Sequence, residues 1–125
     1  IRHILKNPND GNSAYMFVAD QSPNVNDVNY GLGFLNQKTP VFIGYDKLAT
    51  RLNLAFVYCD MKKVKRGYYQ VNYYRIYPDE EKFREFEVVQ KFHQMLETTI
   101  RRRPDNYLWS HRRWKYSDAI KKFYS

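Results

Sequence analysis

At 125 residues the chain holds one domain at most, and its hydrophobic share of 43% allows a packed core and excludes wholesale disorder. No apolar run in the sequence approaches the length that crosses a membrane, and no signal peptide is visible. The formal net charge of +8 at pH 7 predicts an anionic partner: nucleic acid, a membrane surface or an acidic protein. The single cysteine, Cys59, excludes an internal disulfide and fits a reducing compartment.

The start of the chain predicts a short helix and then a buried strand. Ile1, Ile4 and Leu5 share one helical face, which indicates the tail of a helix already under way. We therefore expect residues 1–125 to be either a single domain or a fragment of a longer protein. The apolar run Ala14–Ala19 has the length of a buried strand.

The middle of the chain predicts a long polar loop, a helix and a β-hairpin. Residues 21–38 form the loop, and a short extended piece at Thr39–Gly44 leads into a helix at Tyr45–Asn53. The hairpin consists of a buried strand at Leu54–Cys59, a basic turn at Lys62–Gly67 and a returning strand at Tyr68–Tyr77. The apolar Tyr69, Val71 and Tyr73 alternate with the polar Gln70 and Asn72, so we expect one buried face, and we expect Cys59 to be buried as a small apolar residue.

A long helix is predicted to open at Pro78 and to end at Pro104. Acidic residues stand in its first turn and three arginines in its last turn, where the helix dipole favours each charge. His93 lies beside its apolar stripe, and we expect it at a solvated or edge position. The stripe comprises Phe83, Phe86, Val89, Phe92, Leu96 and Ile100, which are three or four residues apart.

The motif YLWSHRRWK at Tyr107–Lys115 gathers two tryptophans, a histidine, two arginines and a lysine. Trp suits a boundary between apolar and polar surroundings, and the planar donor fork of Arg fits phosphate or carboxylate. The motif fits an anionic, partly apolar partner, and the alternative is a strap whose aromatic rings pack on the core. Because adjacent side chains point in different directions, one of Arg112 and Arg113 should be held inside by a carboxylate or by carbonyls, and the other should face solvent or a ligand.

Signals for catalysis are weak in this sequence. Asp20 and Gln21 follow the strand expected at Ala14–Ala19, at the position where open α/β sheets bind ligands, and an ordinary turn is the alternative. The three histidines are isolated in sequence and the single cysteine has no partner at ligand spacing, so no metal site is predicted. His111 is disfavoured as a general base because Arg112 and Arg113 stand beside it.

The motif at Tyr107–Lys115 resembles the C-terminal signature of the bacterial lipid A biosynthesis acyltransferases, which are lauroyl and myristoyl transferases of the lysophospholipid acyltransferase superfamily. Val18–Gln21 is similar to the family's Pro-Asp-Gln segment at the end of a core strand. Phe34–Asn36 followed by Thr39 resembles its Phe-Phe-Gly…Thr segment, and Gly67-Tyr68 resembles its hairpin turn. The resemblance spans nearly the whole chain.

The chain also departs from the family pattern. Ala19, Ser22 and Asn36 stand where the family has Pro, Asp and Gly. The family's catalytic pair is a His followed five positions later by an acid, and His3 does not supply it because the residue five positions on is Pro8. The resemblance therefore implies the C-terminal half of such an enzyme, without the family's membrane anchor, and predicts that the 125-residue chain alone is inactive.

The resemblance implies an α/β fold, in which this chain supplies part of a mixed central sheet flanked by helices, together with a β-hairpin and a long C-terminal helix. It implies transfer of a fatty acyl group from an acyl carrier protein, or another acyl thioester, to a lipid A precursor or related lipid, with no cofactor. The implied partners are this donor, the anionic lipid acceptor, the cytoplasmic face of the bacterial inner membrane and the missing N-terminal half. The implied substrate-binding residues are Asp20, Gln21, Phe34, Thr39, His111, Arg112, Arg113 and Lys115, with Trp109 and Trp114 at the membrane interface.

Two other functions stay open. A basic, tyrosine-rich nucleic-acid-binding module is indicated by Tyr68, Tyr69, Tyr73 and Tyr74, which stand among lysines and arginines and would offer stacking faces. Against this reading, no ribonucleoprotein-type motif is present and Tyr at alternate strand positions usually packs in a core, so nucleic acid is the less favoured partner. The third reading is a noncatalytic lipid- or carrier-binding domain.

Overall fold

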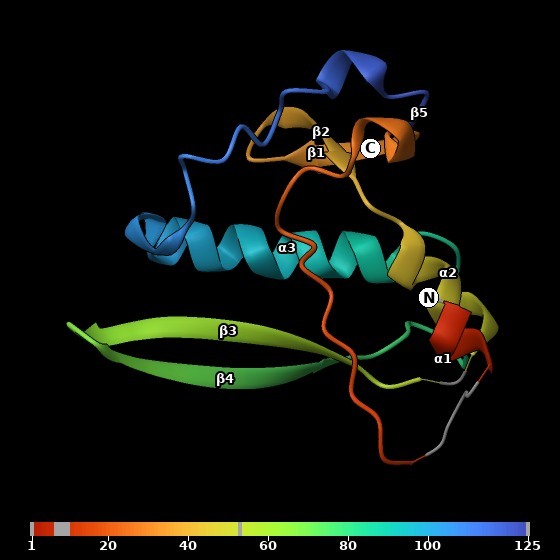
Figure 1. Ribbon diagram of the computed structural model, residues 1–125, viewed down its shortest axis with the longest axis horizontal. Coiled ribbons are helices and arrows are strands. Elements are labelled where there is room, and N and C mark those ends of the chain that lie inside the picture. The colour runs from red at the N-terminus through yellow and green to blue at the C-terminus, as the bar shows by residue number, and fades with distance from the viewer. Residues whose placement is uncertain (1, 7–10, 53, 125) are drawn as a thin grey trace.

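Helix α3 (Glu87–Arg102) lies between a three-stranded sheet and a two-stranded hairpin (Figure 1). This computed structural model describes residues 2–6, 11–52 and 54–124. Two further helices, α1 (Arg2–Lys6) and α2 (Gly44–Arg51), stand near the N-terminal end of α3 (Figure 1). Both were expected from the sequence, although Ile1 and Asn53 lie outside the described residues. The α/β fold class, with a mixed sheet, a hairpin and a long helix towards the C-terminus, is confirmed.

The mixed sheet has the strand order β2-β1-β5. Strands β1 (Tyr30–Phe34) and β2 (Gln37–Val41) are antiparallel, and β5 (Lys122–Tyr124) runs parallel to β1. All of β1 and the start of β2 fall within residues 21–38, so the prediction of a polar loop there is wrong. Short 3-10 helices connect other parts of the chain, at Val25–Asp27 (η1), Pro104–Asn106 (η2) and Ser117–Ala119 (η3).

The turn between β1 and β2 explains why the sequence did not reveal this pair. Leu35 and Asn36 have φ values of 49° and 61°, the left-handed pair that a two-residue hairpin requires. Glycine usually supplies one of these positions, so Leu-Asn gives little signal. In the sequence, Gly31 of β1 is typical of a loop. In the structure, a Cβ at this position would come within 2.5 Å of Ile120 Cδ1. This glycine is needed for close packing within a sheet.

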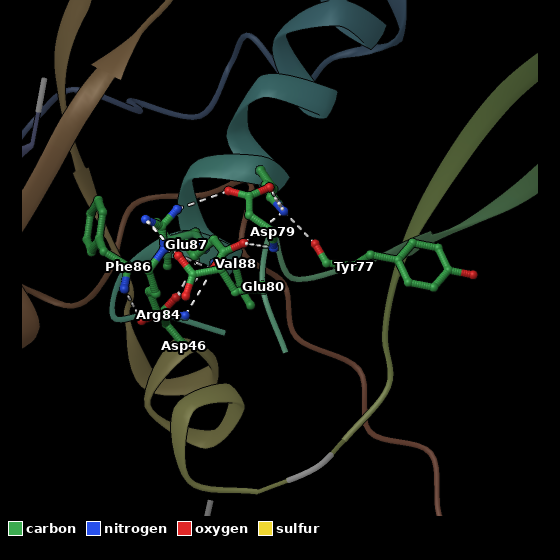
Figure 2. A network of polar contacts seen from close by, with 10 residues as sticks. Asp46, Tyr77, Asp79, Glu80, Arg84, Phe86, Glu87 and Val88 are labelled. Atoms are coloured by element: carbon green, nitrogen blue, oxygen red, sulfur yellow. Dashed lines mark hydrogen bonds and ion pairs between the residues drawn. The ribbon is translucent and has the colours of Figure 1, made fainter. Parts of the chain in front are cut away.

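Helix α3 begins at Glu87, nine residues after the predicted start at Pro78. Its first N–H groups are bound by the buried Asp46 of α2, not by the neighbouring acids (Figure 2). Asp46 Oδ2 accepts from Phe86 N at 2.6 Å, and Oδ1 accepts from Val88 N at 3.1 Å. Phe86 has a left-handed φ of 72°, which ends the irregular segment before the helix. The predicted start is wrong because the capping carboxylate comes from a distant part of the chain.

The predicted hairpin is confirmed, with β3 (Phe56–Lys65) antiparallel to β4 (Tyr68–Ile76). The predicted burial is wrong, because Tyr69, Val71 and Tyr73 are exposed and so is Cys59. The other face of the hairpin packs on α3, where Tyr58 Oη donates to Thr99 Oγ1 at 2.9 Å and Arg102 Nη2 donates to Asp60 Oδ2 at 2.6 Å. Alternation along a strand reveals two faces, but it does not reveal which of them the helix covers.

The strand expected at Ala14–Ala19 is not formed. This segment is extended coil that crosses α3 and the hairpin (Figure 1), and the Met16 side chain is 86% exposed. Only Phe17 and Ala19 contact the core, where the rings of Phe17 and Tyr45 lie 5.8 Å apart. An apolar run forms a strand only when another strand takes up its backbone hydrogen bonds, and among the described residues none does. No helix in the described part of the chain is both long and apolar enough to cross a bilayer.

Candidate functional site

Arg113 is the most deeply buried member of the C-terminal motif, with 1% of its surface exposed. Its Nη1 donates to the Pro40 carbonyl of β2 at 2.6 Å, and its Nη2 lies 3.3 Å from His93 Nε2 of α3. Its guanidinium carbon lies 5.9 Å from the centre of the Phe34 ring. Among the described residues no carboxylate forms an ion pair with it, and its buried Nε has no hydrogen-bond partner. Arg113 therefore joins the sheet to α3 through neutral acceptors.

His93 is the neutral partner of this arginine. Its Nδ1 lies 2.8 Å from the Val89 carbonyl, which only accepts, so Nδ1 carries the proton and Nε2 is free to accept from Arg113. Burial lowers the pKa of His93 to about 4, with the Arg113 charge adding to the effect and the Val89 bond opposing it. The expected solvated or edge position is wrong, since His93 is 3% exposed.

The segment Asp20–Ser22 is held against the C-terminal motif. His111 Nε2 accepts from Ser22 N at 2.9 Å, Ser22 Oγ donates to the Arg113 carbonyl, and Tyr107 Oη donates to the Asp20 carbonyl at 2.9 Å. These contacts join positions that lie far apart in the sequence. They correct the expectation that Asp20 and Gln21 follow a strand, because both lie in coil, where they are partly buried.

Thr39 and Trp114 connect the motif to β2. Thr39 is fully buried, and its Oγ1 donates to the Gln37 carbonyl at 2.9 Å and accepts from Trp114 Nε1 at 2.7 Å. Trp114 is partly buried and packs against the core. The ring of Phe34 lies edge-on to that of His93, with centroids 5.4 Å apart. Thr39, Phe34 and Trp114 therefore belong to the same assembly as Arg113.

The remaining residues of the motif face outwards. Arg112 and Lys115 are exposed, and Lys115 Nζ lies 4.9 Å from the centre of the Tyr116 ring. Trp109 is 51% exposed, and its Nε1 donates to the Pro104 carbonyl at 2.6 Å. The expected division between the two arginines is confirmed: Arg113 is held inside by a backbone carbonyl and Arg112 faces solvent.

Comparison with known proteins adds one finding. The family model described as bacterial lipid A biosynthesis acyltransferase matches residues 1–116. The chain belongs to this family. No curated protein and no solved structure matches it.

In this member of the lipid A acyltransferase family, the side chains around Arg113 hold one another in place, and Arg112 and Lys115 are exposed cations beside them. Both histidine Nε2 atoms already accept hydrogen bonds, His111 from Ser22 and His93 from Arg113, so neither is poised to take a proton from a substrate. No group of three or more metal-ligating side chains occurs in the described residues. A pocket of about 240 Å³ lies elsewhere, between α1, β1 and α2, and none of the expected site residues lines it.

Three side chains of this assembly were not anticipated as site residues: Ser22, His93 and Tyr107. His93 had a usable signal, because Val89, His93, Leu96 and Ile100 follow the same three- and four-residue spacing as the buried stripe. Reading His93 as part of the stripe would have predicted a buried imidazole that needs two partners. Tyr107 had no comparable signal, because its partner Asp20 lies 87 residues away.

Proposed function

We propose that this chain is the C-terminal part of an acyltransferase that moves a fatty acyl group from an acyl carrier protein, or another acyl thioester, to a hydroxyl of a lipid A precursor. The observation that carries the proposal is the family match over residues 1–116. It is supported by the way in which three of the four segments similar to the family come together. Val18–Gln21 with the neighbouring Ser22, Thr39 of the segment that begins at Phe34, and the motif Tyr107–Lys115 meet around Arg113.

The proposal divides the chemistry between two parts of the enzyme. A His and an acid outside this chain would take the hydroxyl proton of the acceptor and orient the base. Within this chain the exposed Arg112 and Lys115 would contact the phosphates of the lipid or the acidic carrier protein. Asp20, Gln21 and His111 would line the acceptor side, and the buried Phe34, Thr39 and Arg113 would hold that side in place. No metal or other cofactor is needed for this chemistry.

The proposed place of action is the cytoplasmic face of the bacterial inner membrane, where the chain would lie as a peripheral part of the enzyme. Its net charge of +8 is suited to anionic headgroups and to an acidic carrier protein. Trp109, half-exposed beside the cationic motif, is suited to the boundary between headgroups and hydrocarbon. Trp114 is engaged with Thr39 and would contribute less there than expected.

Acyl transfer tests the proposal directly. The 125-residue chain, incubated with dodecanoyl acyl carrier protein and a lipid A precursor, should show no transfer, because none of its histidines is followed five positions later by an acid. A chimera in which the chain replaces the C-terminal portion of an active family member should transfer the acyl group. In that chimera Arg112→Gln should raise KM about fivefold and leave the melting temperature unchanged. Arg51→Gln, which replaces another exposed arginine on α2, should change neither.

Two results would contradict the proposal. The first is turnover by the isolated chain that disappears in His111→Ala, because the base would then lie within this chain. The second is a chimera that melts cooperatively and binds the carrier protein but transfers no acyl group.

A further inference from the structure

One face of the β3–β4 hairpin is left uncovered by the described residues. We call it the outer face. The residues on it follow from strand alternation and from the register, in which Met61 pairs with Val71 and Cys59 with Tyr73. It comprises Val57, Cys59, Met61 and Lys63 of β3 and Tyr69, Val71, Tyr73 and Arg75 of β4, all of them exposed. In Figure 1 the hairpin is the long ribbon below α3, and α3 lies on one side of it.

The outer face is more apolar than a solvated surface requires. Met61 is 51% exposed, Tyr69 57% and Tyr73 70%, and the aliphatic Val57 and Val71 lie among them. Contiguous apolar side chains on a soluble surface usually mark an interaction site. A hairpin with one face free is also an unusual use of strand residues, because two strands alone are marginally stable.

The charge of the hairpin is one-sided. The outer face carries Lys63 at one end and Arg75 at the other, and it carries no acid. Lys62, Lys65 and Arg66 stand around the turn, and Lys65 Nζ lies 4.2 Å from the centre of the Tyr68 ring. Asp60, the acid of these two strands, is buried on the opposite face, where Arg102 neutralises it. The partner of the outer face should therefore be anionic as well as partly apolar.

We infer that the outer face of the β3–β4 hairpin docks on an anionic lipid bilayer. Aliphatic side chains in the centre of the face would enter the acyl boundary, tyrosines would lie at the level of the headgroups, and the cations would contact lipid phosphates. RNA would use the tyrosine rings for stacking, but it would gain little from Val57, Met61 and Val71, which offer no flat face. The inference rests on the proposed function in one respect only, since a lipid substrate makes a bilayer the expected apolar partner.

Vesicle co-sedimentation tests this inference. The chain should bind phosphatidylcholine vesicles that contain phosphatidylglycerol, should bind pure phosphatidylcholine weakly, and should dissociate as salt rises. The double variant Met61→Ser, Val71→Ser should lower the partition coefficient about tenfold. Met16→Ser is the control, because Met16 is an exposed methionine that is not part of the outer face, and it should have no effect.

A second pair of variants tests the contribution of the cations to vesicle binding. Lys63→Gln should weaken binding to the anionic vesicles about fivefold, and Lys82→Gln, an exposed lysine in the segment before α3, should weaken it much less. Circular dichroism and the urea midpoint should be unchanged in every variant, because the side chains replaced are already exposed.

Several results would overturn the inference. Equal losses in Met16→Ser and in the double variant would remove the outer face from the contact, and equal binding to neutral vesicles would remove the need for anionic lipid. Tighter binding to single-stranded polyuridine than to vesicles, lost in Tyr73→Ser, would make nucleic acid the partner. Self-association that disappears in the double variant would show that the partner of the outer face is a second copy of the chain. If the chimera is active but vesicle binding does not depend on Met61, this inference alone is wrong. If vesicle binding depends on the outer face as expected but the chimera is inactive, only the proposed function is wrong.

Discussion

Arg112 and Arg113 are neighbours in sequence with opposite surroundings. Arg113 is enclosed by Pro40, His93 and Phe34, and Arg112 is exposed. That one of the two would be buried could be predicted, because successive side chains cannot point the same way. Which of the two is buried could not be predicted, because this depends on how the irregular turns of the motif lie against β2. His93 was expected at a solvated or edge position although its spacing fits the buried stripe, and its role as the acceptor for a distant arginine has no signal in the nearby sequence.

The two arginines should separate in their effects on stability. Arg113→Gln should lower the free energy of unfolding by about 3 kcal/mol, because the buried Pro40 carbonyl and His93 Nε2 both lose their donor. Arg112→Gln should change it by less than about 0.5 kcal/mol. Urea denaturation followed by circular dichroism measures both. Similar small changes for the two variants would mean that the motif is a solvated strap and that the burial of Arg113 contributes nothing.

His93 should make the protein sensitive to mild acid. In the unfolded chain its pKa is 6.5 and in the folded protein about 4, so between these values the unfolded state binds the extra proton. Stability is therefore retained above pH 6.5 and lost as pH falls to 4, by about 3 kcal/mol in total at about 1.4 kcal/mol per pKa unit. Urea midpoints measured across this range test it.

His93→Leu is the control for that titration. It removes the titrating group and should flatten the dependence between pH 6.5 and 4, although it also lowers stability at neutral pH because Arg113 loses an acceptor. Glu87 affects only the lowest part of this range, because burial raises its pKa but bonds from Lys91 and from the backbone N–H of Arg84 and Asp79 lower it to about 2. Its contribution is lost only below pH 4.5. An unchanged slope in His93→Leu would assign the acid sensitivity to other groups.

At the scale of elements, α2 and α3 depend on one carboxylate. Asp46 lies in the first turn of α2 and accepts from three backbone N–H groups at the start of α3 (Figure 2). The existence of both helices could be predicted from apolar spacing. The start of α3 could not be predicted, because Asp79, Glu80 and Glu81 have the composition of a first helical turn. The residue that caps the helix lies about 40 positions earlier in the chain.

Removing that carboxylate should destabilise the pair of helices. Asp46→Ala should lower the free energy of unfolding by about 2 kcal/mol, since three buried N–H groups lose their acceptor. Asp27→Ala is the control: Asp27 stands in the first turn of η1 and is exposed, so about 0.5 kcal/mol or less is expected. Equal losses in the two variants, measured by urea denaturation, would contradict the role given to Asp46.

At the scale of the whole molecule, sequence patterns predicted the type of most elements and misjudged their surroundings. The α/β class, α2 and the hairpin agree with the structure, because each is set by local spacing. Tyr69, Val71 and Tyr73 were expected inside and are outside, since alternation does not say which face α3 covers. Ala14–Ala19 was expected to form a strand, but no described strand pairs with it.

The bond between Ser22 and Arg113 spans 91 residues, and β1 likewise meets β5 only at the end of the chain. Synthesis proceeds from the N-terminus at about 5–20 residues per second, so Asp20–Ser22 waits on the order of 5–20 s for the residues that hold it. Met16 and Val18, just before this segment, are exposed even in the folded protein. On the ribosome, the assembly around Arg113 is therefore among the last features of this chain to form, and Asp20–Ser22 lacks its partners for that whole interval.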